Sequence, residues 1–243
     1  KPLLATGPSP RLDCEAPKGG ARRMFLEIPD LLQPNEVERL RVIAAEAKFV
    51  DGRISNPHST AKNNLQLDRA SPLFQESSAL VMQAFTRSAP FREFALPRRI
   101  AAPLLARYEP GMTYGIHSDA AIMPLQPVSI RADLSCTVFI AAPDSYEGGE
   151  LVSYIGDKAV AAKGQPGSAI VYPSTTLHEV RPVTRGQRLV SITFIESYVA
   201  DPGQREILFA LNEVSAEEGL KIDWRNRARL EFARNNLIRM WSS

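Results

Sequence analysis

The amino-acid sequence predicts a mainly β protein with flanking α-helices, built as an antiparallel sandwich or jelly roll. Between residues 100 and 197, short segments rich in Val, Ile, Tyr, Phe and Thr are separated by turn signals such as Gly148-Gly149. No helical periodicity interrupts them, which argues against the helical crossovers that join parallel strands. The expected strands are residues 103–108, 134–141, 150–155, 158–162, 168–172 and 188–196.

Helices are expected before this β region. Pro34 suits the first turn of a helix, and apolar residues follow it at helical spacing as far as Ala47. A second helix is expected from Ser71-Pro72 to about Thr86, because Ser is a good helix cap and Pro is tolerated in the first turn.

The C-terminal region returns to helix after Asp201-Pro202. Residues from about 216 to 241 are expected to be helical. Their apolar side chains available for packing are Leu220, Trp224, Leu230, Phe232, Leu237 and Trp241. We therefore expect an irregular Pro/Gly-rich arm over residues 1–22, a jelly-roll domain with its N-terminal helices over residues 23–200, and a helical extension over residues 201–243 packed on that domain.

The composition is that of an ordinary globular chain. With 29 basic and 27 acidic side chains, the net charge of +2 gives no reason to expect nucleic acid or an anionic membrane as a partner. The C-terminal arginines are expected to coat a solvated face; they are Arg225, Arg227, Arg229, Arg234 and Arg239. No apolar run approaches the roughly 18 residues of a membrane span. Cys14 and Cys136 form no disulfide framework, so a reduced, cytoplasmic chain is expected, and homo-oligomerisation stays open.

Three residues have the chemistry of a metal site. In extended backbone, His117 and Asp119 point to the same face and can reach one ion. Alone this pair is weak evidence, because acidic residues occupy 27 of 243 positions and a surface pair is the simpler interpretation. His178 follows several expected hairpins later, where a rolled-up sheet can return it to the pair. Two imidazoles and one carboxylate then make the facial triad of non-haem Fe(II) sites, although His178 also suits a core position.

Arg188 begins an expected apolar strand, where a buried guanidinium is costly unless it meets an anion. A bidentate carboxylate, such as the distal group of 2-oxoglutarate, satisfies it. The alternatives are a salt bridge to Glu196 or Asp133, or a solvent-facing position. Tyr108 and Tyr114 precede the metal pair and can donate to the same acid, although strand tyrosines more often pack in the core.

Residues 105–119, Leu-Ala-Arg-Tyr-Glu-Pro-Gly-Met-Thr-Tyr-Gly-Ile-His-Ser-Asp, resemble the iron-binding stretch of the PKHD-type hydroxylases. These are bacterial relatives of the prolyl 4-hydroxylase branch of the Fe(II)/2-oxoglutarate dioxygenases. The resemblance continues through residues 131–140, 146–151 and 172–188, and it covers about residues 24–241.

The resemblance implies a double-stranded β-helix of the jelly-roll type. It carries the iron ligands onto His117, Asp119 and His178, the carboxylate anchor onto Arg188, and more weakly a cofactor-binding role onto Tyr108. It also suggests Lys62, Asn63 and Asn64 as residues at the substrate mouth, although a polar loop capping a strand explains them equally well. Each metal-bound imidazole is expected to donate its other N–H to a carbonyl or a carboxylate.

The implied activity is hydroxylation of an unactivated C–H bond, with Fe(II), 2-oxoglutarate and O2, L-ascorbate as an optional reductant, and release of succinate and CO2. The substrate is expected to be an amino acid, a peptidyl residue or a small metabolite, selected by loops over residues 52–64 and 120–129. Asp119 favours hydroxylation over halogenation, because halogenating relatives carry a small residue there. The alternatives are a Zn or Mn cupin-type enzyme, which leaves Arg188 without a purpose, and a non-catalytic iron or oxygen sensor. A nucleic-acid demethylase is disfavoured by the near-neutral charge.

Overall fold

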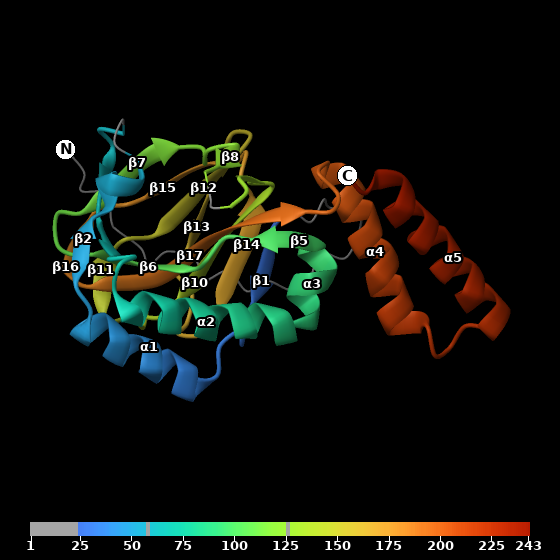
Figure 1. Cartoon of the computed structure of the whole chain (residues 1–243). Coiled ribbons are helices and arrows are strands. Elements are labelled where there is room, and N and C mark those ends of the chain that lie inside the picture. The colour runs from blue at the N-terminus through green and yellow to red at the C-terminus, as the bar shows by residue number, and fades with distance from the viewer. Residues whose placement is uncertain (1–23, 57–58, 125–126) are drawn as a thin grey trace, which may run out of the picture.

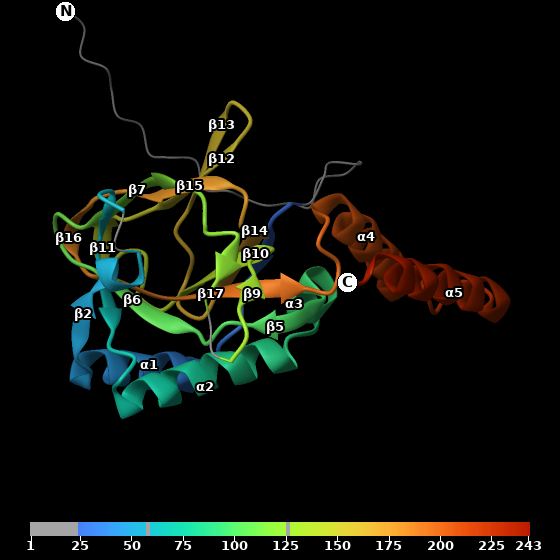
Figure 2. The same ribbon diagram turned by 45° about the horizontal axis from the view of Figure 1, so that its top comes forward.

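The computed structural model describes residues 24–56, 59–124 and 127–243, so the expected arm over residues 1–22, along with His58, lies outside the described residues. Two antiparallel sheets form the body of the molecule, and helices cover the outer face of the larger one (Figure 1). Figure 2 shows the same layers from a second direction. The predicted class, mainly β with flanking helices, is confirmed.

The larger sheet contains, in spatial order, β1 (Leu26–Ile28), β14 (Ala169–Pro173), β10 (Leu134–Phe139), β17 (Arg188–Ser197), β6 (Leu104–Tyr108), β4 (Leu65–Leu67) and β2 (Phe49–Asp51), with β5 (Pro97–Ile100) beside β17. The smaller sheet contains β13 (Lys158–Ala162), β12 (Leu151–Ile155), β15 (Leu177–Val180), β7 (Thr113–His117) and β3 (Lys62–Asn63). Two short ribbons complete the β structure: β11 (Tyr146–Gly148) with β16 (Val183–Gly186), and β8 (Ile122–Met123) with β9 (Ile130–Arg131). All six expected strands are present, with ends displaced by at most two residues.

The helices are α1 (Pro34–Glu46), the short 3-10 helix η1 (Gly52–Ser55), α2 (Pro72–Arg87), α3 (Ala89–Ala95), α4 (Pro202–Glu218) and α5 (Trp224–Trp241). Ser71 caps α2 as expected, because its side chain accepts a hydrogen bond from the backbone N–H of Leu73. The buried face of α1 also agrees with the predicted spacing; it consists of Val37, Leu40, Ile43 and Ala44.

The core has two parts. One lies between the helices and the larger sheet and includes Leu40, Phe85 and Ile195. The other lies between the two sheets and includes Tyr108 and Tyr172. The second cluster contains phenol groups as well as aliphatic side chains, so the space between the sheets combines packing with polar chemistry.

The C-terminal region differs from its prediction. A single helix over residues 216–241 is wrong, because the chain turns at residues 219–223 and Asp223 caps a new helix by accepting from the N–H of Arg225. Leu220, Trp224 and Phe232, which were expected to be available for packing, are 93%, 73% and 72% exposed, so the rest of the described chain does not cover them. None of the described helices is both long and apolar enough to cross a membrane.

Candidate functional site

His117 and His178 meet because they are cross-strand partners. β7 and β15 are antiparallel neighbours, and their register places His178 directly opposite His117 with ring centroids 4.3 Å apart. Asp119 follows the end of β7, and its carboxylate oxygens lie 3.8 Å from Nε2 of His117 and 3.7 Å from Nε2 of His178. The ligand atoms of all three side chains lie within 4.8 Å of one another. The structure therefore brings the three expected metal-site residues together.

Both imidazoles have Nδ1 engaged by a backbone carbonyl, which leaves Nε2 available as a metal ligand. Nδ1 of His117 lies 2.8 Å from the carbonyl oxygen of Gly115, and Nδ1 of His178 lies 2.9 Å from that of Thr176. A carbonyl oxygen can only accept, so each Nδ1 carries a proton and donates it. The Nε2 lone pairs are left to face the carboxylate, and the backbone supplies the carbonyl partners expected of metal-binding imidazoles.

The carboxylate of Asp119 is oriented by two serines. Ser135 of β10 donates a 2.6 Å hydrogen bond from Oγ to Oδ2 of Asp119, and Oγ of Ser174 lies 2.7 Å from Oγ of Ser135. The backbone N–H of Asp119 also donates to the carbonyl oxygen of Ser174. Reasoning from the sequence missed both serines. The available signal was the alternation of Ser135 and Thr137 with apolar residues along β10.

The three side chains of the cluster are largely shielded from solvent. The side chains of His117, Asp119 and His178 are only 16%, 13% and 6% exposed. Burial lowers the pKa of His117, and the neighbouring imidazole of His178 lowers it further. A lowered pKa keeps the imidazole neutral, which is the form that binds a metal. Two imidazoles with one carboxylate on a common face fit the ligand set of non-haem Fe(II) oxygenases.

Arg188, the first residue of β17, is buried at 2% exposure, and the phenol of Tyr108 lies within electrostatic reach of both Arg188 and Asp119. Its cross-strand partner is Tyr108 of β6, and the guanidinium carbon lies 5.0 Å from the centroid of that ring. Among the described residues, no carboxylate lies within ion-pair distance of Arg188, and its Nε atom has no hydrogen-bond partner. Burying a guanidinium without a carboxylate partner is unfavourable, and an anion would remove that cost.

The internal partners considered for Arg188 are engaged elsewhere. Oε2 of Glu196 lies 2.9 Å from Nε of Arg99, and Oδ1 of Asp133 lies 2.7 Å from Nε of Arg131. Neither Glu196 nor Asp133 therefore forms the salt bridge with Arg188 that the sequence left open.

The surroundings of Arg188 add hydroxyl groups and open space. The phenol of Tyr146 hydrogen-bonds the guanidinium; burial raises the pKa of Tyr146, while Arg188 opposes that rise. Burial also raises the pKa of Tyr108, which Arg188 and Asn64 partly offset. Both phenols are therefore protonated donors at neutral pH. Gly149 lies beside Arg188. A side chain at this position would crowd the arginine, because its Cβ would lie 3.1 Å from Cδ of Arg188, and glycine avoids that contact. Neither Tyr146 nor Gly149 was expected from the sequence, which gave no signal for their proximity to Arg188.

Tyr114 and Lys62 form one wall of the cluster. The Tyr114 ring stacks on His117 with centroids 3.6 Å apart, and its hydroxyl accepts a 3.2 Å hydrogen bond from Asn56. Lys62 is the cross-strand partner of Tyr114; its Nζ lies 5.4 Å from the Tyr114 centroid and donates to Ser55 at 2.7 Å. Burial lowers the pKa of Lys62, although Asp119 opposes that shift. The hydroxyl of Tyr114 thus contacts Asn56 near the surface, while its ring contacts the histidine.

The three expected mouth residues do not share one face. Lys62 and Asn64 are buried at 8% and 4% exposure, whereas Asn63 is exposed and donates to the carbonyl oxygen of Gly111. Strand alternation separates Asn63 from its neighbours. The expected selectivity loops, residues 52–64 and 120–129, are described only in part.

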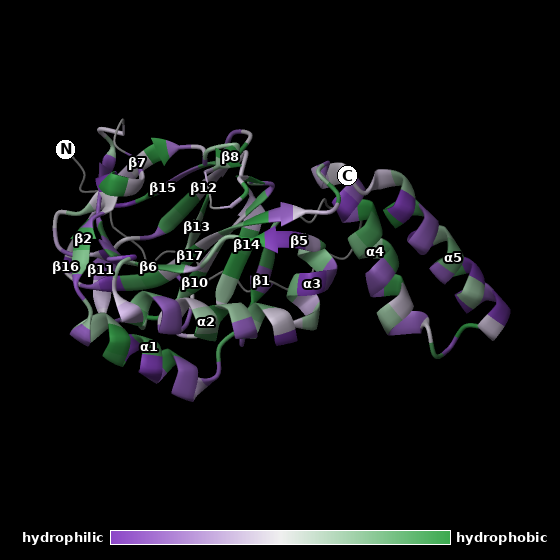
Figure 3. Cartoon of the chain, viewed as in Figure 1, coloured by the Kyte–Doolittle hydropathy of each residue, from purple (hydrophilic) through white to green (hydrophobic). Residues whose placement is uncertain are grey.

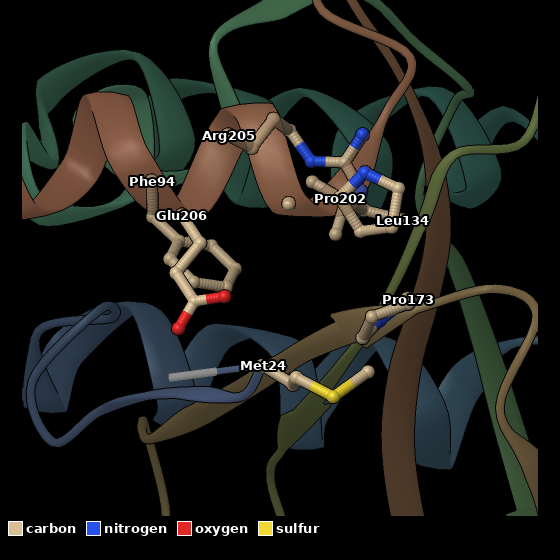
Figure 4. Close-up of a pocket in the computed structure, with 8 residues that line it drawn as sticks. Met24, Phe94, Leu134, Pro173, Pro202, Arg205 and Glu206 are labelled. Carbon is tan, nitrogen blue, oxygen red and sulfur yellow. The ribbon is translucent and has the colours of Figure 1, made fainter. Parts of the chain in front are cut away.

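A pocket of about 60 Å³ where α4 begins is separate from this cluster (Figure 4). Its lining is mainly apolar and includes Met24 and Phe94. The guanidinium of Arg205 donates to the carbonyl oxygens of Val199 at 2.7 Å and Ala200 at 2.8 Å. That arginine therefore fixes the start of α4.

Comparisons with known proteins agree with this geometry. A sequence profile of the 2OG-Fe(II) oxygenase superfamily matches residues 103–196, the stretch that holds the cluster and Arg188. A PKHD-type hydroxylase of Sphingopyxis alaskensis is 51% identical over 217 residues, which is 89% of this chain and 99% of that protein. A PKHD-type hydroxylase of Gluconacetobacter diazotrophicus is 37% identical over 224 residues, which is 90% of this chain and 99% of that protein.

Solved structures share the fold. A Pseudomonas putida prolyl-4-hydroxylase aligns with a TM-score of 0.53 at 19% identity, over 71% of this chain and 92% of that chain. A prolyl hydroxylase of Trichoplax adhaerens, in complex with a peptide fragment of hypoxia inducible factor, aligns with a TM-score of 0.51 at 15% identity, over 76% of this chain and 87% of that chain. The double-stranded β-helix implied by the sequence resemblance is thereby confirmed. Given 51% identity over most of its length, the chain belongs to the PKHD-type hydroxylases, a family of Fe(II)- and 2-oxoglutarate-dependent dioxygenases.

Proposed function

We propose that this dioxygenase hydroxylates an unactivated C–H bond of an amino acid, a peptidyl residue or a small metabolite, and that 2-oxoglutarate leaves as succinate and CO2. His117, Asp119 and His178 would hold Fe(II). When bound, Fe(II) with 2-oxoglutarate and O2 supplies the oxidising power that protein side chains lack. The contribution of the chain is to bind, orient and shield the reacting groups.

The observation that carries this proposal is the combination of a three-ligand cluster with a buried guanidinium that has no carboxylate partner among the described residues. A metal site alone would equally suit a Zn or Mn cupin-type enzyme. Such an enzyme gives no reason to bury Arg188 without a carboxylate, which is unfavourable in the absence of a ligand. An anionic co-substrate resolves that cost, and the dicarboxylate 2-oxoglutarate offers one carboxylate to the arginine while the other end faces the metal.

Specific roles follow for the residues around the guanidinium. The distal carboxylate would accept from Arg188, with the buried phenols of Tyr108 and Tyr146 as further donors. Tyr114 is the weaker candidate for this role, because its hydroxyl is engaged by Asn56. Stacking of the Tyr114 ring on His117 instead supports a role in fixing that ligand. Lys62 and Asn64 would meet the substrate at the mouth, whereas the outward position of Asn63 weakens its candidacy.

An anaerobic titration tests the proposal. Apo-protein is titrated with Fe(II), then with 2-oxoglutarate, and the visible spectrum is followed for the weak charge-transfer band that a bound keto acid gives. The band is expected only when both are present. Arg188→Ala should lose the band at moderate 2-oxoglutarate concentration, and His178→Ala should lose it at all concentrations. A band that is indifferent to Arg188 would remove that residue as the anchor, and tight Fe(II) binding by the His178 variant would remove the metal assignment.

Turnover distinguishes an enzyme from a sensor that keeps the same site. Succinate release in air, dependent on Fe(II) and 2-oxoglutarate and stimulated by ascorbate if the metal oxidises during uncoupled cycles, supports the oxygenase. A protein that forms the complex but releases no succinate above a His178→Ala control supports the sensor instead.

A further inference from the structure

The C-terminal helices form a hairpin beside the sheets. Its base is attached to the body: Phe94 of α3 meets Phe209 of α4 edge-on with ring centroids 5.4 Å apart, and Ser242 forms a β-bridge with Val199. α5 lies on the side of α4 that faces away from the sheets (Figures 1 and 2). The second helix of the hairpin thus has α4 as its neighbour on one side and an uncovered surface on the other.

Several large apolar side chains on that surface are exposed to solvent among its charged and polar residues. No residue of α5 is buried by the part of the chain that the structure describes. Trp224, Phe232 and Met240 are 73%, 72% and 74% exposed, and Leu220 in the turn before α5 is 93% exposed. α4 adds Ile207 and Val214, both about half exposed, and Figure 3 shows apolar residues along both helices. Large apolar side chains that are exposed together on one element are a candidate interaction surface.

The composition of α5 is that of an interface core. Trp, Phe, Met and Arg are the residues enriched where proteins meet, and Lys is depleted there. α5 contains two Trp, one Phe, one Met and five Arg, and no Lys. Trp224, Ala228 and Phe232 recur at a spacing of four, so they form one stripe along the helix and can pack into another helix.

We propose that the hairpin of α4 and α5 is a dimerisation surface whose occupant is the same hairpin of a second copy of this chain. The two hairpins would form a four-helix arrangement around a two-fold axis parallel to the helices, with their tips together. Each α4 would then lie between the two α5 helices and each α5 between the two α4 helices, with neighbours antiparallel.

The opposite charges of α4 and α5 favour a second copy of this chain over other partners. α4 carries four glutamates and one buried arginine, whereas α5 carries five arginines and one glutamate. Every contact in the proposed arrangement therefore joins an acidic helix to a basic one. Near the tips, Glu217 and Glu218 of one copy meet Arg225 and Arg229 of the other. A partner of one charge sign, such as a nucleic acid, would instead face repulsion over half of the hairpin.

The dimensions suit a reversible dimer. A helix of 18 residues is about 27 Å long, and two adjacent helices span about 20 Å, so the face has a footprint of roughly 500 Å² before side-chain relief is counted. Specific interfaces bury about 600–800 Å² per partner. A surface of this size is expected to give association in about the micromolar range.

Sedimentation equilibrium of the full chain over about 1–200 µM tests the proposal. The wild type is expected to shift from the monomer mass towards twice that mass. Trp224→Asp and Phe232→Asp should each weaken association by about 30-fold or more, as substitutions of central aromatic anchors do. Ile155→Asp is the matched control, since it adds the same charge at an exposed apolar position at the β12–β13 turn. It should dimerise like the wild type.

A wild type that stays monomeric throughout, or Asp variants that dimerise like the control, would overturn the proposal. Circular dichroism and succinate release confirm that each variant is folded.

If the Asp variants do not fold, a charge-swap pair replaces them. Arg225→Glu with Arg229→Glu, and Glu217→Arg with Glu218→Arg, should each reduce self-association, and an equimolar mixture should recover a heterodimer. Failure of the mixture to associate counts against the alternating arrangement.

Residues 1–22 are the competing occupant within the chain, and a deletion distinguishes them. Removing residues 1–22 should leave the dimer unchanged. A monomer that dimerises only after the deletion would assign the hairpin surface to that segment and overturn the proposal.

Discussion

Ser135 donates a 2.6 Å hydrogen bond to Oδ2 of Asp119, and this contact links the larger sheet to the cluster on the smaller one. Ser135 belongs to β10, and Asp119 follows β7 of the opposite sheet. Ser174 lies 2.7 Å from the Ser135 hydroxyl and so fixes the direction in which that hydroxyl points. The orientation of the carboxylate therefore depends on how the two sheets face each other.

Ser135→Ala is expected to lower Fe(II) affinity by about 10–100-fold, because groups that orient metal ligands have effects of this size. Anaerobic isothermal titration with Fe(II) measures it. Ser191→Ala is the matched control, since it removes a buried hydroxyl from β17, the strand next to β10. Its neighbours Leu189 and Ile195, of the same strand parity, belong to the core beneath the helices, so its side chain faces away from the cluster. Equal affinities of the two variants would contradict the role of Ser135.

Arg188→Met is expected to separate stability from function. The guanidinium is buried without a carboxylate, so an apolar side chain of similar length removes a desolvation cost and should leave the apo-protein at least as stable as the wild type. The variant should need about 30-fold or more 2-oxoglutarate to reach half-saturation, because one partner of a buried charge pair is lost. Thermal melts with and without 2-oxoglutarate check both parts. A large fall in the apo melting temperature would show that Arg188 stabilises the fold in its own right.

The elements that could be predicted from sequence are those set by local pattern. The six expected strands and the buried face of α1 follow from periodicities of two and 3.6 residues, which need no knowledge of the rest of the chain. The break at residues 219–223 was missed because α4 and α5 carry continuous helix-forming residues on either side of it. The cap at Asp223 was overlooked as a helix start.

The candidate site was predictable by residue type and not by arrangement. His117 with His178, Tyr108 with Arg188, and Tyr114 with Lys62 are each cross-strand partners, so strand register alone sets these proximities. Register depends on tertiary pairing and cannot be derived from the pattern of one strand. Ser135 and Tyr146 escaped notice for the same reason, because their partners lie on distant segments.

The lowered pKa of His117 predicts how the stability of the apo-protein depends on pH. In the unfolded chain this imidazole titrates near its ordinary value of 6.5, whereas burial lowers the pKa in the folded state. As the pH falls through 6.5, the unfolded state binds a proton at this imidazole more readily than the folded state does. The free energy of unfolding therefore decreases. Above that pH the effect vanishes. The slope due to one such group is at most about 1.4 kcal/mol per pH unit.

His117→Gln removes that titration and should flatten the pH dependence between about pH 5 and 6.5. Urea unfolding in chelator-treated buffer measures the free energy of unfolding of both proteins at each pH. Parallel profiles for wild type and variant would show that the folded environment does not disfavour the charged imidazole.

Gly148→Ala should destabilise the protein more than Gly156→Ala, and the difference isolates a close approach of two backbone segments. Both glycines have positive φ, +70° and +61°, so both substitutions carry strain of about 1 kcal/mol. At Gly156 a Cβ meets nothing within 4 Å, whereas at Gly148 it would lie 2.0 Å from the carbonyl oxygen of Pro182. The β11–β16 ribbon must then shift, and a total cost of about 3 kcal/mol or more is expected for Gly148→Ala. Urea unfolding of both variants measures the two costs. Equal stability of the two variants would mean that the ribbon accommodates the methyl group freely.

Because Gly149 borders Arg188, the Gly148 variant should also bind 2-oxoglutarate more weakly.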